Sequence, residues 1–83
     1  MNRLTHAEAT ELLETAFNVT GDDMGNTVSA TLLDMDERRA WADVESYLAM
    51  IPREIDPSSI QIRGDVVDET IDAVTITIFT GEA

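Results

Sequence analysis

Electric charge is the feature that most restricts how this chain can fold. Seventeen aspartates and glutamates oppose five arginines, lysine is absent, and the net charge is -12 over 83 residues. Self-repulsion of this size opposes any compact state. Every apolar stripe therefore has to contribute to one core, because a domain this small lies near the size at which a single core is just sufficient.

The composition nevertheless predicts a globular protein. Hydrophobic residues make up 43% of the chain, whereas disordered segments combine high charge with low hydrophobicity. We expect one acidic domain over residues 1–83. The absence of cysteine makes a reducing cytoplasm the default location. The sequence lacks both a signal-peptide pattern and a run of 18 apolar residues, so we expect no membrane span.

A first helix is predicted to begin after Thr5. Thr5 and Glu8 have the spacing of a capping box, in which each side chain accepts a hydrogen bond from the backbone of the other residue. The apolar residues that follow recur with helical periodicity; they are Ala9, Leu12, Leu13, Ala16 and Phe17. The glycine-containing and aspartate-containing segment 18–26 is predicted to be a loop.

A strand and a second helix come next. Residues 27–33 alternate between apolar and polar side chains, as a half-buried strand does. Asp34 with Glu37 offers a second capping pattern, and an apolar helical stripe extends over 40–51. Pro52 is expected to end this helix, because the residue before a proline avoids the helical conformation.

Two further strands complete the predicted fold. After a connector at 53–59, residues 60–66 and 74–78 alternate on either side of a turn at 68–70. The order is then helix, strand, helix, strand, strand. An α+β domain with a three-stranded antiparallel sheet and two helices on one face would bury all of these stripes.

Five acidic residues are the candidate contacts for a partner. Glu8, Glu11 and Glu14 recur every three residues, so neighbouring carboxylates on the helix lie roughly 5–6 Å apart at Cβ and repel one another. Such a row resembles a line of phosphates, although it also suits an ordinary solvated helix face. Asp22 and Asp23 follow in the loop, where turn formation alone would explain them.

The sequence predicts neither a metal site nor a catalytic site. Asp34 and Asp36 begin like a calcium-binding loop, but Arg39 stands where that loop needs glycine. His6 is the only histidine and is predicted to be an exposed residue in the helix cap. Because no nucleophile and base can be assembled around it, we expect a protein that is not an enzyme and that uses no cofactor.

The charge predicts the kind of partner. A strongly negative chain repels phosphate backbones and anionic lipids, so we expect direct binding neither to nucleic acid nor to membranes. In size and charge the chain resembles the nucleic-acid mimics with which phages block restriction or CRISPR complexes, a likeness that involves no motif. We therefore predict a small acidic inhibitor that masks the basic nucleic-acid-binding surface of a protein.

Two other functions are compatible with this sequence. Proteins of salt-loving archaea resemble this chain in replacing lysine by aspartate, glutamate and some arginine, and their acidity is an adaptation to solvent. An oligomeric structural or adaptor subunit is the other alternative. Its last strand, residues 74–80, carries no lysine or proline that would prevent edge pairing, so a homodimer formed through this strand is expected.

Overall fold

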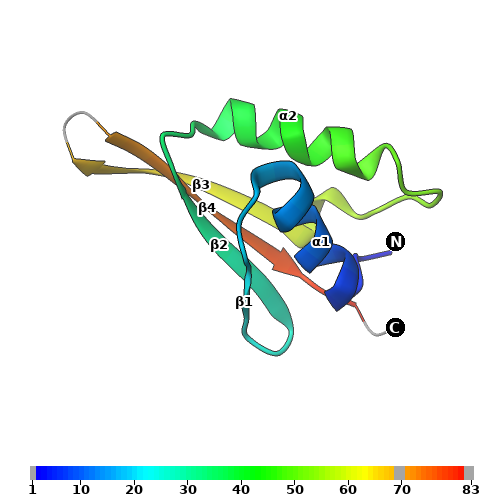
Figure 1. Ribbon diagram of the computed structural model, residues 1–83. Coiled ribbons are helices and arrows are strands. Elements are labelled where there is room, and N and C mark those ends of the chain that lie inside the picture. Colours follow the sequence, from blue (N-terminus) through cyan, green and yellow to red (C-terminus); the bar gives the residue numbers. More distant parts are fainter. Residues whose placement is uncertain (1, 69–70, 82–83) are drawn as a thin grey trace.

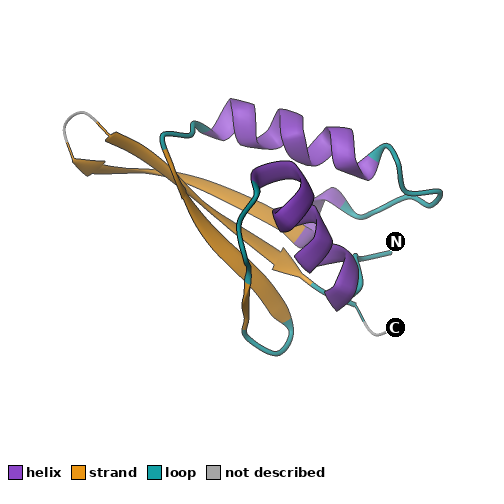
Figure 2. Cartoon of the chain, viewed as in Figure 1, coloured by secondary structure: helices purple, strands orange, loops and turns teal. Residues whose placement is uncertain are grey.

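The computed structural model describes residues 2–68 and 71–81, without the side chains of 65–68. It confirms the α+β class: an antiparallel sheet forms one layer, and both helices pack on the same face of it (Figures 1 and 2). We call the uncovered side of the sheet the outer face. The elements are α1 (His6–Phe17), β1 (Asp22–Asp23), β2 (Thr27–Leu33), α2 (Glu37–Leu48), the 3-10 turn η1 (Pro57–Ser59), β3 (Ile60–Asp68) and β4 (Ile71–Phe79).

The sheet has four strands in the order β1-β2-β4-β3, so the prediction of three strands was wrong. The additional strand, β1, lies within the predicted loop and pairs Asp22 with Ser29 and Asp23 with Val28. A tight turn at Gly25 (φ 87°) connects it to β2, and the Gly25 amide donates to Asp23 Oδ1 at 2.9 Å. Two consecutive aspartates have low strand propensity and no alternation, so this pairing depends on β2.

The start of α1 agrees with the prediction. The Glu8 amide donates to Thr5 Oγ1 at 3.2 Å, and the Thr5 amide donates to Glu8 Oε1 at 2.9 Å, which completes the capping box. Asn18 ends the helix in the left-handed conformation (φ 55°). The helix buries Ala9, Leu12 and Leu13 against the sheet.

The limits of α2 differ from the prediction at both ends. The cap is Asp36, whose Oδ1 accepts from the Arg39 amide at 2.8 Å, and not Asp34, which adopts a left-handed conformation (φ 57°). The helix ends at Leu48, four residues before Pro52. Amides 50 and 51 donate to carbonyls three residues earlier, so the chain leaves the helix through a tightened turn.

The last strand has no free edge. β4 pairs with β2 on one side and with β3 on the other, so the homodimer expected from edge pairing of residues 74–80 lacks the unpaired strand that it requires. The long edge strand is β3 instead. Its Gly64 amide donates to Glu37 Oε1 of α2 at 2.7 Å, which satisfies one of the outward backbone donors of that edge.

The register separates an apolar face from a polar one. Alternate residues of β2 and β4 point toward the helices and are buried, and they pair as Val28 with Ile78, Ala30 with Ile76, and Leu32 with Val74. The helices add Leu12, Leu13 and Val44, each of which is fully buried. The intervening residues of β2 and β4 form the outer face: Thr27, Ser29, Thr31, Leu33, Ala73, Thr75, Thr77 and Phe79. Across the described residues, neither helix has the length and apolar character that crossing a membrane requires.

The turn predicted at 68–70 falls mostly on residues 69 and 70, which lie outside the described part of the chain. The strands on either side of it are longer than expected. β3 continues to Asp68, with an irregularity in pairing between Val66 and Asp68, and β4 begins at Ile71.

Candidate functional site

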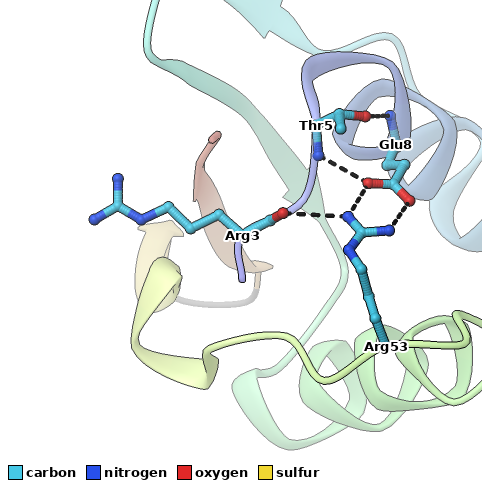
Figure 3. A network of polar contacts seen from close by, with 4 residues as sticks. All are labelled: Arg3, Thr5, Glu8 and Arg53. Carbon is cyan, nitrogen blue, oxygen red and sulfur yellow. Dashed lines mark hydrogen bonds and ion pairs between the residues drawn. The ribbon is translucent and has the colours of Figure 1, made fainter. Parts of the chain in front are cut away.

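Glu8, the first member of the predicted acidic row, is neutralised by Arg53. The Arg53 guanidinium forms a bidentate ion pair with it: Nη1 donates to Glu8 Oε2 at 2.7 Å, and Nη2 donates to Glu8 Oε1 (Figure 3). Arg53 Nη2 also donates to the Arg3 carbonyl at 3.2 Å. The Glu8 carboxylate therefore connects the start of α1 with the segment that follows α2.

This arrangement changes the acidity of Glu8. The hydrogen bonds from Arg53 and those from Thr5 lower the pKa of Glu8 from 4.5 to about 2, and partial burial opposes them. The Glu8 side chain is 25% exposed, and that of Arg53 is 33% exposed. Glu8 is consequently an ionised structural group whose charge is already matched.

Glu11 and Glu14 are exposed on α1. Three residues advance an α-helix by about 300°, so each glutamate of the row is displaced by about 60° around the axis from the one before it. The row therefore winds over the solvent side of α1, from the side that faces Arg53 toward the opposite side. Among the described residues, Glu8 is the one member of the row with an ion-pair partner, so Glu11 and Glu14 present the unmatched charge of the row.

The structure separates the two aspartates of β1. Asp22 pairs with Ser29 and so shares the outer face, whereas Asp23 pairs with Val28 and lies on the helix side. Asp23 Oδ2 is 2.9 Å from His6 Nε2. Hydrogen bonding from the Gly25 amide and from His6 lowers the pKa of Asp23. The five predicted contacts thus do not form one continuous patch.

His6 is more enclosed than the sequence predicts. It is the first residue of α1, and its side chain is 38% exposed. Nε2 faces Asp23, and Nδ1 lies 3.4 Å from the Thr80 hydroxyl oxygen. The imidazole ring therefore contacts β1 and the residue that follows β4. These contacts explain why His6 is less exposed than the sequence predicts.

A groove between α1 and α2 brings acidic and apolar groups together. This hollow of about 260 Å³ is lined by Thr15, Ala16, Asp43, Ser46, Tyr47 and Met50. Ala16 and Met50 give it an apolar surface, and Met50 is 69% exposed. Asp43 contributes a carboxylate from α2. We call this hollow the helix groove.

Tyr47 reports the electrostatic environment of the helix groove. Tyr47 is buried, with 8% of the residue exposed. Burial, together with the negative charges of Glu11 and Glu8, raises the pKa of Tyr47. Glu11 is therefore close enough to α2 for its charge to act on a residue that lines the groove.

A larger hollow lies at the other end of α2. It has a volume of about 520 Å³ and is lined by Met35, Asp36, Glu37, Arg38, Gly64, Asp72 and Ala73. Two of its carboxylates have structural partners, since Asp36 caps α2 and Glu37 holds the Gly64 amide. Arg38 adds a positive charge. Within the described residues, no three potential metal ligands come together there or elsewhere.

Sequence reasoning missed the groove because its residues come from two helices whose relative placement no local pattern gives. No sequence pattern assigned Asp43 and Met50 to a common groove. Arg53 lies 45 residues from Glu8 in the sequence, so their ion pair could not be predicted either. No family model, curated protein or solved structure matches this chain significantly.

Proposed function

We propose that this protein is a non-enzymatic acidic binding module that masks the basic nucleic-acid-binding surface of a protein partner, as phage inhibitors of restriction or CRISPR complexes do. The observation that supports this role is the helix groove, in which an apolar floor lies beside Asp43 and within the field of Glu11. The groove would receive a lysine or arginine side chain from the partner.

The chemistry of a basic side chain suits this groove. Lysine and arginine bury their methylene stems along apolar surface while the charged head remains near solvent or an anion. Ala16 and Met50 would contact the stem, and Asp43 would accept from the head. An exposed methionine adds a flexible apolar surface that adapts to different partners.

In this proposal Glu11 and Glu14 supply the surrounding negative charge. Both are exposed on α1, and α1 carries no arginine. Glu8 has a structural role because its charge is matched by Arg53. Long-range attraction to a basic surface would accelerate association, and added salt would suppress that acceleration.

The test compares two double charge reversals. The Glu11→Lys and Glu14→Lys pair, and the Glu45→Lys and Glu54→Lys pair, each replace two exposed carboxylates and change the net charge from -12 to -8. The wild-type chain is used to capture proteins from a nuclease-treated lysate. Each captured protein is then assayed for binding to labelled duplex DNA or RNA by fluorescence anisotropy, with and without the chain.

We expect the wild type to displace the nucleic acid and the reversal on α1 to weaken this inhibition by about tenfold or more. The control pair should weaken it much less. Equal losses in both pairs would show that only net charge matters, which contradicts a contact site on α1. A captured partner that still binds nucleic acid in the presence of the chain would contradict masking.

Adaptation to a salt-rich cytoplasm is the second candidate. It is favoured by exposed carboxylates that stand away from the helix groove, including Asp34, Glu54 and Asp72. In this case the acidic side chains would maintain solubility in molar salt, and the biochemical role of the chain would be independent of its charge. Salt dependence of folding distinguishes the two candidates.

A further inference from the structure

The outer face of the sheet differs from the rest of this acidic molecule. Where β2 and β4 pair, none of the outward residues is charged; they are four threonines, a serine, Leu33, Phe79 and Ala73, of which Ala73 is buried. Leu33 is 63% exposed although it is large and apolar. The described neighbours at the margins carry opposite charges, with Asp22 on β1 and Arg63 on β3.

We propose that two copies of this chain associate through their outer faces, with a two-fold axis that runs parallel to the strands between β2 and β4. Two molecules with a charge of -12 repel one another over most orientations. The outer face carries no charge on the paired residues of β2 and β4 and has Asp22 at one margin and Arg63 at the other, so a second copy related by a two-fold axis meets complementary charges there. The proposed occupant of this face is therefore a second copy.

The strand order makes this arrangement self-complementary. The order β1-β2-β4-β3 places the axis at the middle of the sheet, so β2 of one copy lies over β4 of the other, and β1 lies over β3. The rotation keeps each residue at its own level along the strands, so register partners within one sheet face each other across the interface. Leu33 then falls at the level of Ala73, which is only 3% exposed within its own copy, and Thr27 falls over Phe79. Leu33 therefore covers the surface around Ala73, and the smaller Thr27 meets the bulky Phe79.

The same rotation brings the marginal charges together. Asp22 shares a level with Ser29, which pairs with Thr77, and Thr77 pairs with Gln61 of β3. Arg63 lies two residues further along β3, which is about 7 Å. A long arginine side chain covers this distance. Asp22 of each copy thus pairs with Arg63 of the other, and the contact occurs twice.

The centre of the interface consists of hydroxyl groups and methyl groups. Thr31 and Thr75 are neighbours across β2 and β4, with their hydroxyl oxygens 3.4 Å apart. They lie beside the axis, so the equivalent pair of the second copy lies over them. Facing sheets pack about 10 Å apart, a spacing that fits side chains of threonine size. The usual inclination of about 30° between facing strands keeps register partners opposed at this centre and shifts them sideways toward the strand ends.

The size of the face predicts a weak dimer. The paired parts of β2, β4 and β3 extend about 23 Å along the strands and about 14 Å across them, a projected area of roughly 320 Å² per copy. Stable interfaces bury about 800 Å² per partner. We therefore expect a dissociation constant between about 10 μM and about 1 mM, and a concentration-dependent dimer.

Sedimentation equilibrium tests the proposal when the protein concentration is varied across the expected dissociation constant. About 150 mM salt is added to screen the net repulsion. The wild type should dimerise. Thr31→Glu should remain monomeric, because it places two carboxylates beside the axis, whereas Ala42→Glu, on the exposed side of α2, has the same charge and should dimerise like the wild type. Circular dichroism of each dilute variant checks that it is folded.

A charge exchange tests the orientation independently. Asp22→Arg alone and Arg63→Asp alone should each weaken the dimer by about tenfold or more, and the two together should restore it, because the pair is reversed with the net charge unchanged. A wild type that is monomeric throughout, a Thr31→Glu variant that still dimerises, or a double exchange that fails to restore association would each overturn the proposal.

Discussion

The helix layer and the outer face of the sheet differ in how many charged side chains they carry. On the helix layer, carboxylates are numerous, and they are either paired, as Glu8 is with Arg53, or exposed, as Glu11 and Glu14 are. On the outer face, the residues of β2 and β4 carry hydroxyl and apolar groups only. A net charge of -12 is thus compatible with a surface that has strongly unequal faces. The net charge of a small protein therefore does not reveal which of its surfaces meets a partner.

The largest expected change in the free energy of unfolding comes from comparing a substitution on each face of β4. Ile76 of β4 is fully buried between the sheet and the helices, whereas Thr77 points to the outer face. Ile76→Ala should lower the free energy of unfolding by about 2–5 kcal/mol, because it removes buried methylenes and leaves a cavity. Thr77→Ala should lower it by less than about 1 kcal/mol. Urea denaturation of dilute protein measures both, and similar losses would contradict the assignment of faces.

A smaller loss of stability is expected when the ion pair between Glu8 and Arg53 on the helix layer is removed. The pKa of Glu8 falls from 4.5 to about 2 in the folded protein, so the ionised form stabilises the fold. This contribution is fully present above pH 4.5 and is lost as the pH falls through about 2. Because both side chains are partly solvated, we expect Glu8→Gln to lower the free energy of unfolding by about 1–2 kcal/mol at neutral pH.

The control for Glu8 is Glu14, for which the described part of the chain offers no ion-pair partner. Glu14→Gln removes the same charge from the same helix but breaks no ion pair, and it relieves repulsion with Glu11, so stability should be unchanged or higher by a few tenths of a kcal/mol. Thermal melts of the two variants and the wild type from pH 2 to pH 7 provide the comparison. A Glu8→Gln deficit that persists at the acidic end of this range would contradict the ion pair as its cause.

The sequence predicted those parts of the fold that depend on local patterns. The capping box of Thr5 and Glu8, the apolar stripe of α1 and the alternation of β2 all formed as expected. Each of these signals involves residues within one element, where helical or strand periodicity fixes which side chains share a face.

The parts that sequence reasoning missed depend on contacts between elements. The Asp22–Asp23 strand exists because β2 offers an edge, and the central position of β4 follows from its pairing with β2 on one side and β3 on the other. Among the candidate contacts, the sequence placed Glu8 with Glu11 because it could not reveal Arg53 as a partner. It also grouped Asp22 with Asp23, although adjacent strand residues point to opposite faces.

The most direct test of the central claim, that the acidic surface serves recognition, is a thermal melt followed by far-UV circular dichroism in low-salt buffer and again in about 2 M sodium chloride, where repulsion is screened. A binding module must be folded before it meets its partner in ordinary solution. We predict a cooperative transition already in low salt, supported by the buried core and the Glu8 ion pair. A chain that is unfolded in low salt and folds only in molar salt would contradict this account and would assign the acidity to the solvent.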